Sequence, residues 1–321
     1  MTRAARLTLL VLGVVGIVWL VSRTGPRLLL ELVVRVGWSF LAIVALYAVH
    51  VGLRAVALWR SLPAGLVPFA EVLRVRLSGE AVEMLTFTGP FLAEPAKGWL
   101  LTRRGMTTTD AFAAVITEYL LYTVTSSWLA ATALIILLGG GRLPSSVHST
   151  AVLVLGLTLA FIAAFAYAAI AGVGLIVPIL LRSRWMLGRR RAEAAALTFA
   201  PIEDSLIRFL HGRHGRVAQV FVVEAVAQLL LILEIWIVIA VIGLSTSWRT
   251  SLIVEGGVKF IGVVFGFVPG QFGASEGVYV LLARAVGLPA AAGLTLALVR
   301  RVRGLLVAGA GLVVLSRFDH R

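Results

Sequence analysis

Long apolar runs recur along this 321-residue chain and determine its predicted elements. The four clearest runs carry few or no charges: residues 36–53, 111–138, 150–181 and 217–243. An α-helix rises about 1.5 Å per residue, so about 20 apolar residues cross the hydrocarbon core of a bilayer. Each run therefore predicts a membrane-spanning helix, with Pro178 expected to kink the end of the third. A fifth apolar run, 285–316, is interrupted by Arg300, Arg301 and Arg303.

Two other apolar segments, 77–101 and 251–283, contain glycine, proline and acidic residues. Each splits into two pieces of about 10–15 residues, and a helix of that length is too short to cross a bilayer. We therefore predict two re-entrant helical hairpins. Non-helical backbone is tolerated at membrane depth only where protein shields it or where it lines a wet cavity. The two breaks are thus the first place to look for a functional site.

The N-terminal residues 1–22 begin with Arg3 and Arg6 and continue as an apolar run. No cleavage site with small residues follows, so we interpret this segment as an uncleaved first helix. Together the elements predict an all-α polytopic membrane protein. We expect about 6–8 transmembrane helices together with two re-entrant (broken) helical hairpins that are related as inverted repeats. All of them belong to a single transmembrane domain over residues 1–321.

The composition supports this class and excludes others. Apolar residues make up 60% of the chain, charged residues make up 14%, and the mean hydropathy is +1.00. A soluble domain of this size has no core large enough to bury so much apolar surface. The absence of cysteine excludes disulfides, cysteine-ligated metals and thiol catalysis. The histidines lack metal-binding spacing and there is no Walker motif, so we expect no metal, no other cofactor and no ATP-driven step.

Positive charge dominates, with a formal net charge of +14. In a membrane protein this excess is expected to meet anionic lipid and to set topology, and we expect no nucleic-acid partner. The loop 182–216 carries eight arginines against three acids, whereas 139–149 and 244–250 carry one arginine each. The positive-inside rule places 182–216 in the cytoplasm of a bacterial cell, with the protein in the cytoplasmic (inner) membrane. Only the basic segment 23–35 contradicts this count. Within the loop, residues 191–213 predict an amphipathic helix at the inner membrane surface.

The two broken segments resemble each other. One reads TGPFLAEPAKGWLLTRRG and the other PGQFGASEGVYVLLARAVG. Counted from Glu94 and Glu276, a leucine pair begins at +6 and +5, an arginine follows at +9 and +8, and a glycine lies at +11 in both. Three predicted spans separate the segments, and an odd number inverts the second relative to the first. The pattern predicts inverted repeats that meet near the bilayer midplane. Chance is the alternative, because glycine, leucine and arginine are common in this chain.

The breaks also supply candidate lipid-binding or cavity-lining residues. In the second break, Pro269, Gly270 and Gly273 interrupt the backbone just before a helix. The unpaired N–H groups and the dipole at such a helix start favour a carboxylate or a phosphate. Glu94 and Glu276 therefore have two interpretations. They are either a buried functional pair that gates a cavity or couples transport to protons, or they are caps that only build the fold.

Other candidates surround these acids. Lys97 lies one turn from Glu94, so we expect the two to pair, with Lys97 also able to contact a phosphate head group. Glu118 is expected to pair with Arg54 or with Lys97. We include all of them in the predicted lipid-binding site.

Arg300 and Arg303 share one helix face and complete the predicted site. With Arg301 they permit two interpretations. Planar guanidinium groups inside the bundle suit a phosphate-binding cluster. Alternatively, the span covers only 285–299, the arginines snorkel to its inner edge, and 304–316 forms a separate short element.

Four motifs, taken as an ordered set, resemble one family. They are LRAVALWR (53–60), AEPAKGWLLTRRG (93–105), DAFAAVITEYL (110–120) and FVPGQFGASEG (267–277). Over residues 30–316 the chain resembles the transmembrane region of lysylphosphatidylglycerol synthases, a flippase-domain family with many stand-alone members. Ala93 stands where the family's G-E-P-x-K-x-x-L-L pattern has glycine. The resemblance implies a helical domain that binds or moves lipids. It does not imply lipid aminoacylation, which belongs to a soluble domain that this chain does not encode.

These observations lead to one expected function and two alternatives. We expect a non-enzymatic lipid transporter that translocates an amphipathic lipid, anionic or isoprenoid, through a midplane cavity between the repeats. A membrane-embedded enzyme, with Glu94 and Glu276 as an acid/base pair on a lipid-linked substrate, is the first alternative. The second is a scaffold without transport activity that holds a lipid-modifying or lipid-biosynthetic enzyme. Membrane lipids are partners in all three.

Overall fold

The computed structural model describes residues 36–85, 90–140, 145–212, 214–265 and 274–318, with four isolated positions before residue 36. Within these ranges every regular element is a helix, numbered α3 to α14. Four of the described helices are long and apolar enough to cross a membrane: α3 (Ser39–Ser61), α6 (Thr108–Gly139), α7 (Ser145–Ala171) and α11 (His214–Val241). They coincide with the four clearest apolar runs, so the all-helical class is confirmed. The predicted first helix, 1–22, lies outside the described residues.

Each of the two segments predicted to be broken contains parts of two separate described helices. The first segment falls on α4 (Phe69–Leu85) and α5 (Pro90–Thr102), and the second on α12 (Trp248–Phe265) and α13 (Ala274–Ala285). In each pair the two helices pack against each other. The residues between the two helices of each pair, 86–89 and 266–273, lie outside the described residues, and so do Pro269, Gly270 and Gly273. The two breaks therefore stay predictions.

Most of the last apolar run forms one helix, which rules out the alternative of a division at the arginines. Helix α14 (Ala290–Ser316) runs without interruption through Arg300, Arg301 and Arg303. Arg301 and Arg303 are buried, so the snorkelling interpretation is wrong for them. Burial is possible because acidic residues from neighbouring helices meet these guanidinium groups, as described below.

The predicted span 150–181 also needs correction. Helix α7 ends at Ala171, and Gly172 follows with a φ of +65°, a left-handed conformation that glycine adopts without a Cβ clash. The short helix α8 (Ile176–Arg182) then contains Pro178 near its start. The chain therefore turns at Gly172 and not at Pro178, because proline is tolerated in the first turn of a helix.

The basic loop forms two helices, α9 (Arg184–Leu187) and α10 (Arg189–Gly212). The predicted amphipathic helix is α10, whose buried apolar residues recur at helical spacing: Ala192, Ala196, Ile202, Leu206, Phe209 and Leu210. The buried carboxylate of Glu203 on α10 accepts hydrogen bonds from the backbone N–H groups of Ile176 and Val177. It thereby caps α8 and holds α10 against the end of α7. We call α7 to α10 the connecting limb.

The fold has an internal repeat. Gly105 and Gly287, both 11 residues after their glutamates, have φ values of +86° and +82°. Helices α6 and α14 then begin at Thr108 and Ala290, each 14 residues after the glutamate. Units α3–α6 and α11–α14 also make corresponding contacts, since α4 packs on α14 where α12 packs on α6. Chance similarity does not produce matched turns, matched helix starts and matched contacts, so the repeat is structural.

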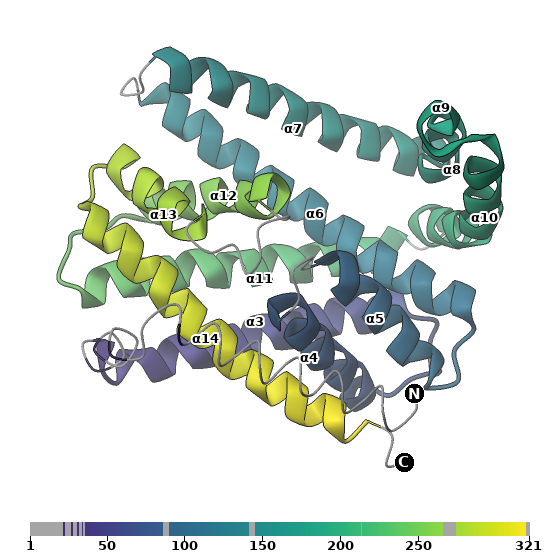
Figure 1. The fold of residues 1–321 in the computed structure, drawn as a ribbon, viewed down its shortest axis with the longest axis horizontal. Coiled ribbons are helices and arrows are strands. Elements are labelled where there is room, and N and C mark those ends of the chain that lie inside the picture. Colours follow the sequence, from purple (N-terminus) through teal and green to yellow (C-terminus); the bar gives the residue numbers. More distant parts are fainter. Residues whose placement is uncertain are drawn as a thin grey trace.

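The two units interlock in opposite directions. In Figure 1, α3 runs against α11 across the middle of the molecule, and α6 and α14 also run in opposite directions. Glycines permit the closest crossings. A Cβ at Gly311 of α14 would collide with the backbone oxygen of Leu77 on α4, and one at Gly256 of α12 would collide with Ala133 on α6. Three hydrophobic clusters form the core of the described residues. One joins α3 to α6 with the end of α14, the second joins α11 to α14 with the start of α3, and the third packs α10 against α3, α6 and α11.

Candidate functional site: two buried charge clusters

Glu118 on α6 is the centre of a charge cluster inside the first unit. Its side chain has no solvent exposure, and one oxygen lies 2.7 Å from Nη2 of Arg54 on α3. Arg76 of α4 approaches the same oxygen at 3.5 Å, and Lys97 of α5 approaches the other oxygen at 3.8 Å. Three cations from three helices thus surround one carboxylate, which explains how a full negative charge is tolerated here.

Three more acids complete this group. Glu94 lies 2.7 Å from Lys97, so the predicted pairing is confirmed. Glu80 lies 2.5 Å from Arg76, and Glu224 of α11 lies 3.5 Å from Nε of Arg54. We refer to this group as the Glu118 cluster; its members are Arg54, Arg76, Glu80, Glu94, Lys97, Glu118 and Glu224.

A second cluster lies between α11, α12 and α14. Arg300 bridges two acids, with Nη2 at 2.6 Å from Glu255 and 3.5 Å from Glu234. Glu234 also pairs with Arg303, and Glu255 pairs with Lys259, four residues further along α12, at 2.6 Å. We refer to Glu234, Glu255, Lys259, Arg300 and Arg303 as the Arg300 cluster. Arg300 and Arg303 therefore do share a face, and that face meets carboxylates.

Glu276 lies outside both clusters. It pairs with Arg301 and accepts a hydrogen bond from the hydroxyl of Ser275 at 2.9 Å. Glu94 and Glu276, at equivalent places in the repeat, thus each have a cation of their own. Their predicted role as a joint cavity-gating pair remains a prediction.

Two tyrosines lie between the clusters. Tyr47 of α3 donates a hydrogen bond from its hydroxyl to Glu80 at 3.0 Å, while Arg303 stacks on its ring at 3.6 Å from the centroid. The ring of Tyr122 on α6 faces Arg54 at 3.7 Å and Lys259 at 5.9 Å. An aromatic ring attracts cations through cation–π contact, so the Tyr122 ring can interact with a cation of each cluster. The clusters are therefore in contact through Tyr47 and Tyr122.

The repeat places ion pairs of opposite polarity at equivalent positions. Arg54 lies seven residues before the end of α3, and Glu234 lies seven before the end of α11. Their partners Glu118 and Arg300 are both the eleventh residue of their helices, α6 and α14. The first unit thus has the cation of the pair on α3, and the second unit has the anion of the pair on the equivalent helix α11.

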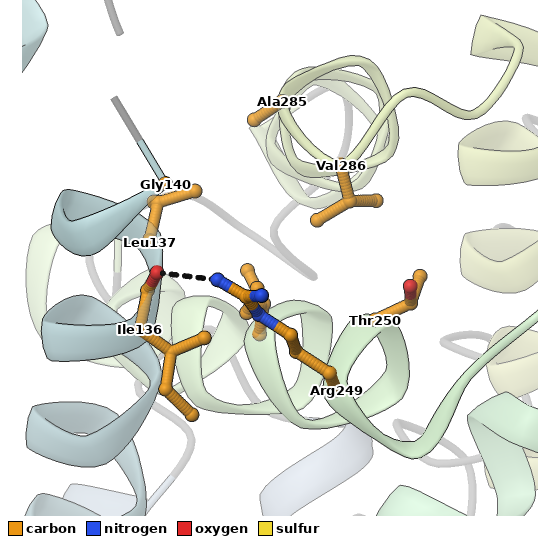
Figure 2. Close-up of a pocket in the computed structure, with 8 residues that line it drawn as sticks. Ile136, Leu137, Gly140, Arg249, Thr250, Ala285 and Val286 are labelled. Atoms are coloured by element: carbon orange, nitrogen blue, oxygen red, sulfur yellow. Dashed lines mark hydrogen bonds between the residues drawn. The ribbon is translucent and has the colours of Figure 1, made fainter. Parts of the chain in front are cut away.

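One pocket of about 320 Å³ lies away from both clusters, between the end of α6, the start of α12 and the end of α13. Figure 2 shows Arg249 of α12 reaching across it toward α6, where Nη2 donates a hydrogen bond to the carbonyl of Ile136 at 3.3 Å. Ala285 and Val286 line the opposite side. None of the residues predicted to bind lipid lines this pocket.

Sequence reasoning therefore found part of the site. The pairs of Glu118 with both Arg54 and Lys97 are confirmed, whereas Arg76, Glu80 and Tyr47 were missed. The sequence did indicate the pair of Arg76 and Glu80, because these residues of the RVRLSGE stretch (74–80) lie four apart on one helix face. Tyr47 had no such signal, because its neighbours in space come from α4 and α14.

The arrangement provides many hydrogen-bonding groups in a region shielded from water. Several buried side-chain atoms in the clusters have no hydrogen-bond partner, among them Nε of Arg54, Arg300 and Arg303. Unmet donors and acceptors of this kind can be used by a polar ligand. Among the described residues no three His, Asp or Glu side chains form a metal-binding group.

Long apolar helices that enclose paired charges define an integral membrane protein. The family model for the lysylphosphatidylglycerol synthase TM region matches residues 6–311, and the chain belongs to this family. The resemblance that the sequence motifs indicated is confirmed. No curated protein and no solved structure matches the chain.

Proposed function

We propose that this protein is a lipid transporter that binds the polar head group of an amphipathic lipid, anionic or isoprenoid, between its two repeat units. The observation that carries the proposal is the pair of buried charge clusters, which meet through Tyr47 and Tyr122 where the units interlock. A head group in hydrocarbon loses its hydrogen bonds with water, and a charged, partly unsatisfied interior replaces them.

In this proposal the helix pairs α4–α5 and α12–α13 are re-entrant hairpins that enter the membrane from opposite sides. The opposite directions of α3 and α11, and of α6 and α14, support this arrangement. Because four described helices suffice to span and the paired shorter helices do not, the hairpins occupy part of the membrane depth each. The basic α9 and α10 lie at the cytoplasmic surface of the inner membrane.

The topology also assigns directions to the two ends of the molecule. Gly140 and Arg249, which line the pocket, belong to the two weakly basic loops 139–149 and 244–250. Because the positive-inside rule puts these loops outside, the pocket opens toward the outer side. The opposite end, where Arg104 pairs with Glu71 at 2.9 Å, faces the cytoplasm. A lipid head group would pass from that closed end through the clusters to the open pocket, while its acyl chains stay in the bilayer.

Liposome reconstitution tests the proposal. Purified protein is incorporated with a fluorescent phospholipid, and a membrane-impermeant quencher reports the label that reaches the outer leaflet. We expect the protein to increase the exchange rate, and Glu276→Gln to decrease it about tenfold, the effect of about 1.4 kcal/mol on a barrier. Glu193→Gln is the matched control, because Glu193 pairs with Arg189 on the exposed face of α10.

The same samples separate the alternatives. A new lipid species on chromatography would support a membrane-embedded enzyme with Glu94 and Glu276 as its acid/base pair. Unchanged lipids with no exchange above protein-free liposomes would reject transport and favour a scaffold for a lipid-modifying or lipid-biosynthetic enzyme. Equal rates for Glu276→Gln and Glu193→Gln would remove Glu276 from the site.

A further inference from the structure

Glu224 differs from every other acid in the two clusters, because both of its carboxylate oxygens lack a hydrogen bond. It is fully buried on α11. Its one ion-pair contact is with Nε of Arg54 at 3.5 Å, while the same guanidinium gives its shorter contact, 2.7 Å, to Glu118. A buried carboxylate without hydrogen bonds loses its hydration and gains little in return.

Gln228 adds a second, independent observation. It lies one turn further along the same face of α11, and its side chain is buried. Its amide nitrogen donates to the hydroxyl of Ser126 on α6 at 2.8 Å, but its carbonyl oxygen has no partner. Glu224 and Gln228 thus present three buried oxygens that lack donors on one helix face, with the hydroxyl oxygen of Ser126 beside them.

The charges of the surroundings point the same way. The Glu118 cluster contains three cations and four carboxylates, which leaves one negative charge in excess. The Arg300 cluster contains three cations and two carboxylates, which leaves one positive charge in excess. An anionic head group at the Arg300 cluster would neutralise that positive charge. The negative excess at Glu224 would then have no compensation in the interior.

We propose that Glu224, Gln228 and Ser126 form a binding site for a monovalent cation, either a proton on the carboxylate or a sodium ion held by the oxygens. Both cations supply what the site lacks, which is one positive charge and a partner for the free oxygens. The proposed coupling of this cation to an anionic head group rests on the proposed function. The site itself does not.

The groups around the site come from every element packed against this part of α11. They are His50 and Arg54 of α3, Arg76 of α4, Glu118 and Tyr122 of α6, Lys259 of α12 and, two turns further along α11, Arg300 of α14 at Leu231. His50 is bonded to the carbonyl of Ala227, and the other cations face nearer carboxylates or an aromatic ring. None of them offers Glu224 a closer charge than Arg54.

Thermal unfolding of the purified full chain, followed by tryptophan fluorescence, tests the site without measuring transport. One series replaces choline chloride by sodium chloride at constant ionic strength, and another lowers the pH from 9 to 5 in choline. If sodium is the ligand, Tm rises with sodium and saturates. If the proton is the ligand, Tm rises as the pH falls, because protonation then stabilises the folded state.

Variants connect the response to the site. Glu224→Gln, which mimics the protonated acid, is expected to abolish either response, and Glu193→Gln to keep it. Gln228→Leu is expected to weaken a sodium response at least about tenfold, a loss of about 1.4 kcal/mol in affinity, and to spare a proton response. Should Glu224→Gln not fold, Ser126→Ala takes its place in the sodium series and Glu224→Asp in the pH series, where the shorter acid is expected to shift the pH midpoint of the response.

Two results would overturn the proposal: a Tm that responds to neither cation, or a response of equal size in wild type and Glu224→Gln. Neither result would touch the lipid-exchange experiment. A protein that exchanges lipid without a cation response would keep the proposed function and lose this site.

Discussion

The two repeat units share a framework but have opposite charges at equivalent places. In each unit a left-handed glycine follows the short helix α5 or α13, and the next helix, α6 or α14, starts three residues after it. Yet Arg54–Glu118 in the first unit corresponds to Glu234–Arg300 in the second. Small residues and apolar spacing are thus kept in both units, whereas the cation and the anion of the buried pair exchange places. Opposite polarity also lets the two units attract each other where they meet.

The two ends of the molecule differ in a related way. The carbonyls of Ile136 and Phe318, 182 residues apart like Glu94 and Glu276, each accept a hydrogen bond from an arginine. At one end Arg249 leaves the pocket open. At the other end, Arg104 also pairs with a glutamate and covers the ring of Phe318 at 4.3 Å. The equivalent carbonyls of Ile136 and Phe318 thus lie beside a pocket at one end and in a closed contact at the other.

The largest effect is expected where the charge comparison is broken. Glu118→Gln removes the carboxylate that Arg54, Arg76 and Lys97 share, so that each cation keeps only its second acid. Breaking a buried ion pair costs about 3–5 kcal/mol. Thermal unfolding in detergent should show a large decrease in Tm. The exposed Glu193→Gln should leave Tm unchanged, because solvent screens its pair with Arg189. Similar Tm values for both variants would mean that the clusters do not stabilise the fold.

A smaller effect is expected at the helix crossing that both units use. Gly311→Ala forces α14 away from the backbone of α4 and is expected to cost about 1–3 kcal/mol. Gly309→Ala, on the same helix with open space around it, should stabilise by about 0.5–1 kcal/mol through helix propensity. Unfolding in the same detergent measures both. Equal changes would mean that the close crossing is unimportant.

The smallest effects are expected at the two ends. Arg104→Gln loses an ion pair, a backbone hydrogen bond and a ring contact, at a cost of about 1–2 kcal/mol. Arg249→Gln loses one hydrogen bond at an exposed position and should change stability by no more than about 0.5 kcal/mol. The difference between the two Tm values measures how firmly the closed end is held. A larger loss for Arg249→Gln would reverse the assignment of the closed end.

The sequence predicted the long helices, the matched spacings after Glu94 and Glu276, and most of the pairs around Glu118, because each has a local signal. Apolar length, Gly–Pro interruptions and spacings of three or four residues are all visible along one segment. The sequence left two interpretations open for the arginines of α14, because the acids that neutralise them lie on α11, α12 and α13. The turn at Gly172 was missed because Pro178 is the stronger local signal for a break. The charge excess of each cluster has no local signal, because the Glu118 cluster draws its residues from five helices and the Arg300 cluster from three.

The connecting limb has a practical consequence. Its helices α7 to α10 pack mainly on one another and on α6, and the contacts that join the two units run instead between α3, α4, α6, α11, α12 and α14. A peptide bond near Gly188, where the backbone is exposed and locally non-helical, is therefore dispensable for assembly. Two co-expressed fragments divided there should recognise each other in the membrane and restore the complete bundle, which would allow each half to be labelled separately.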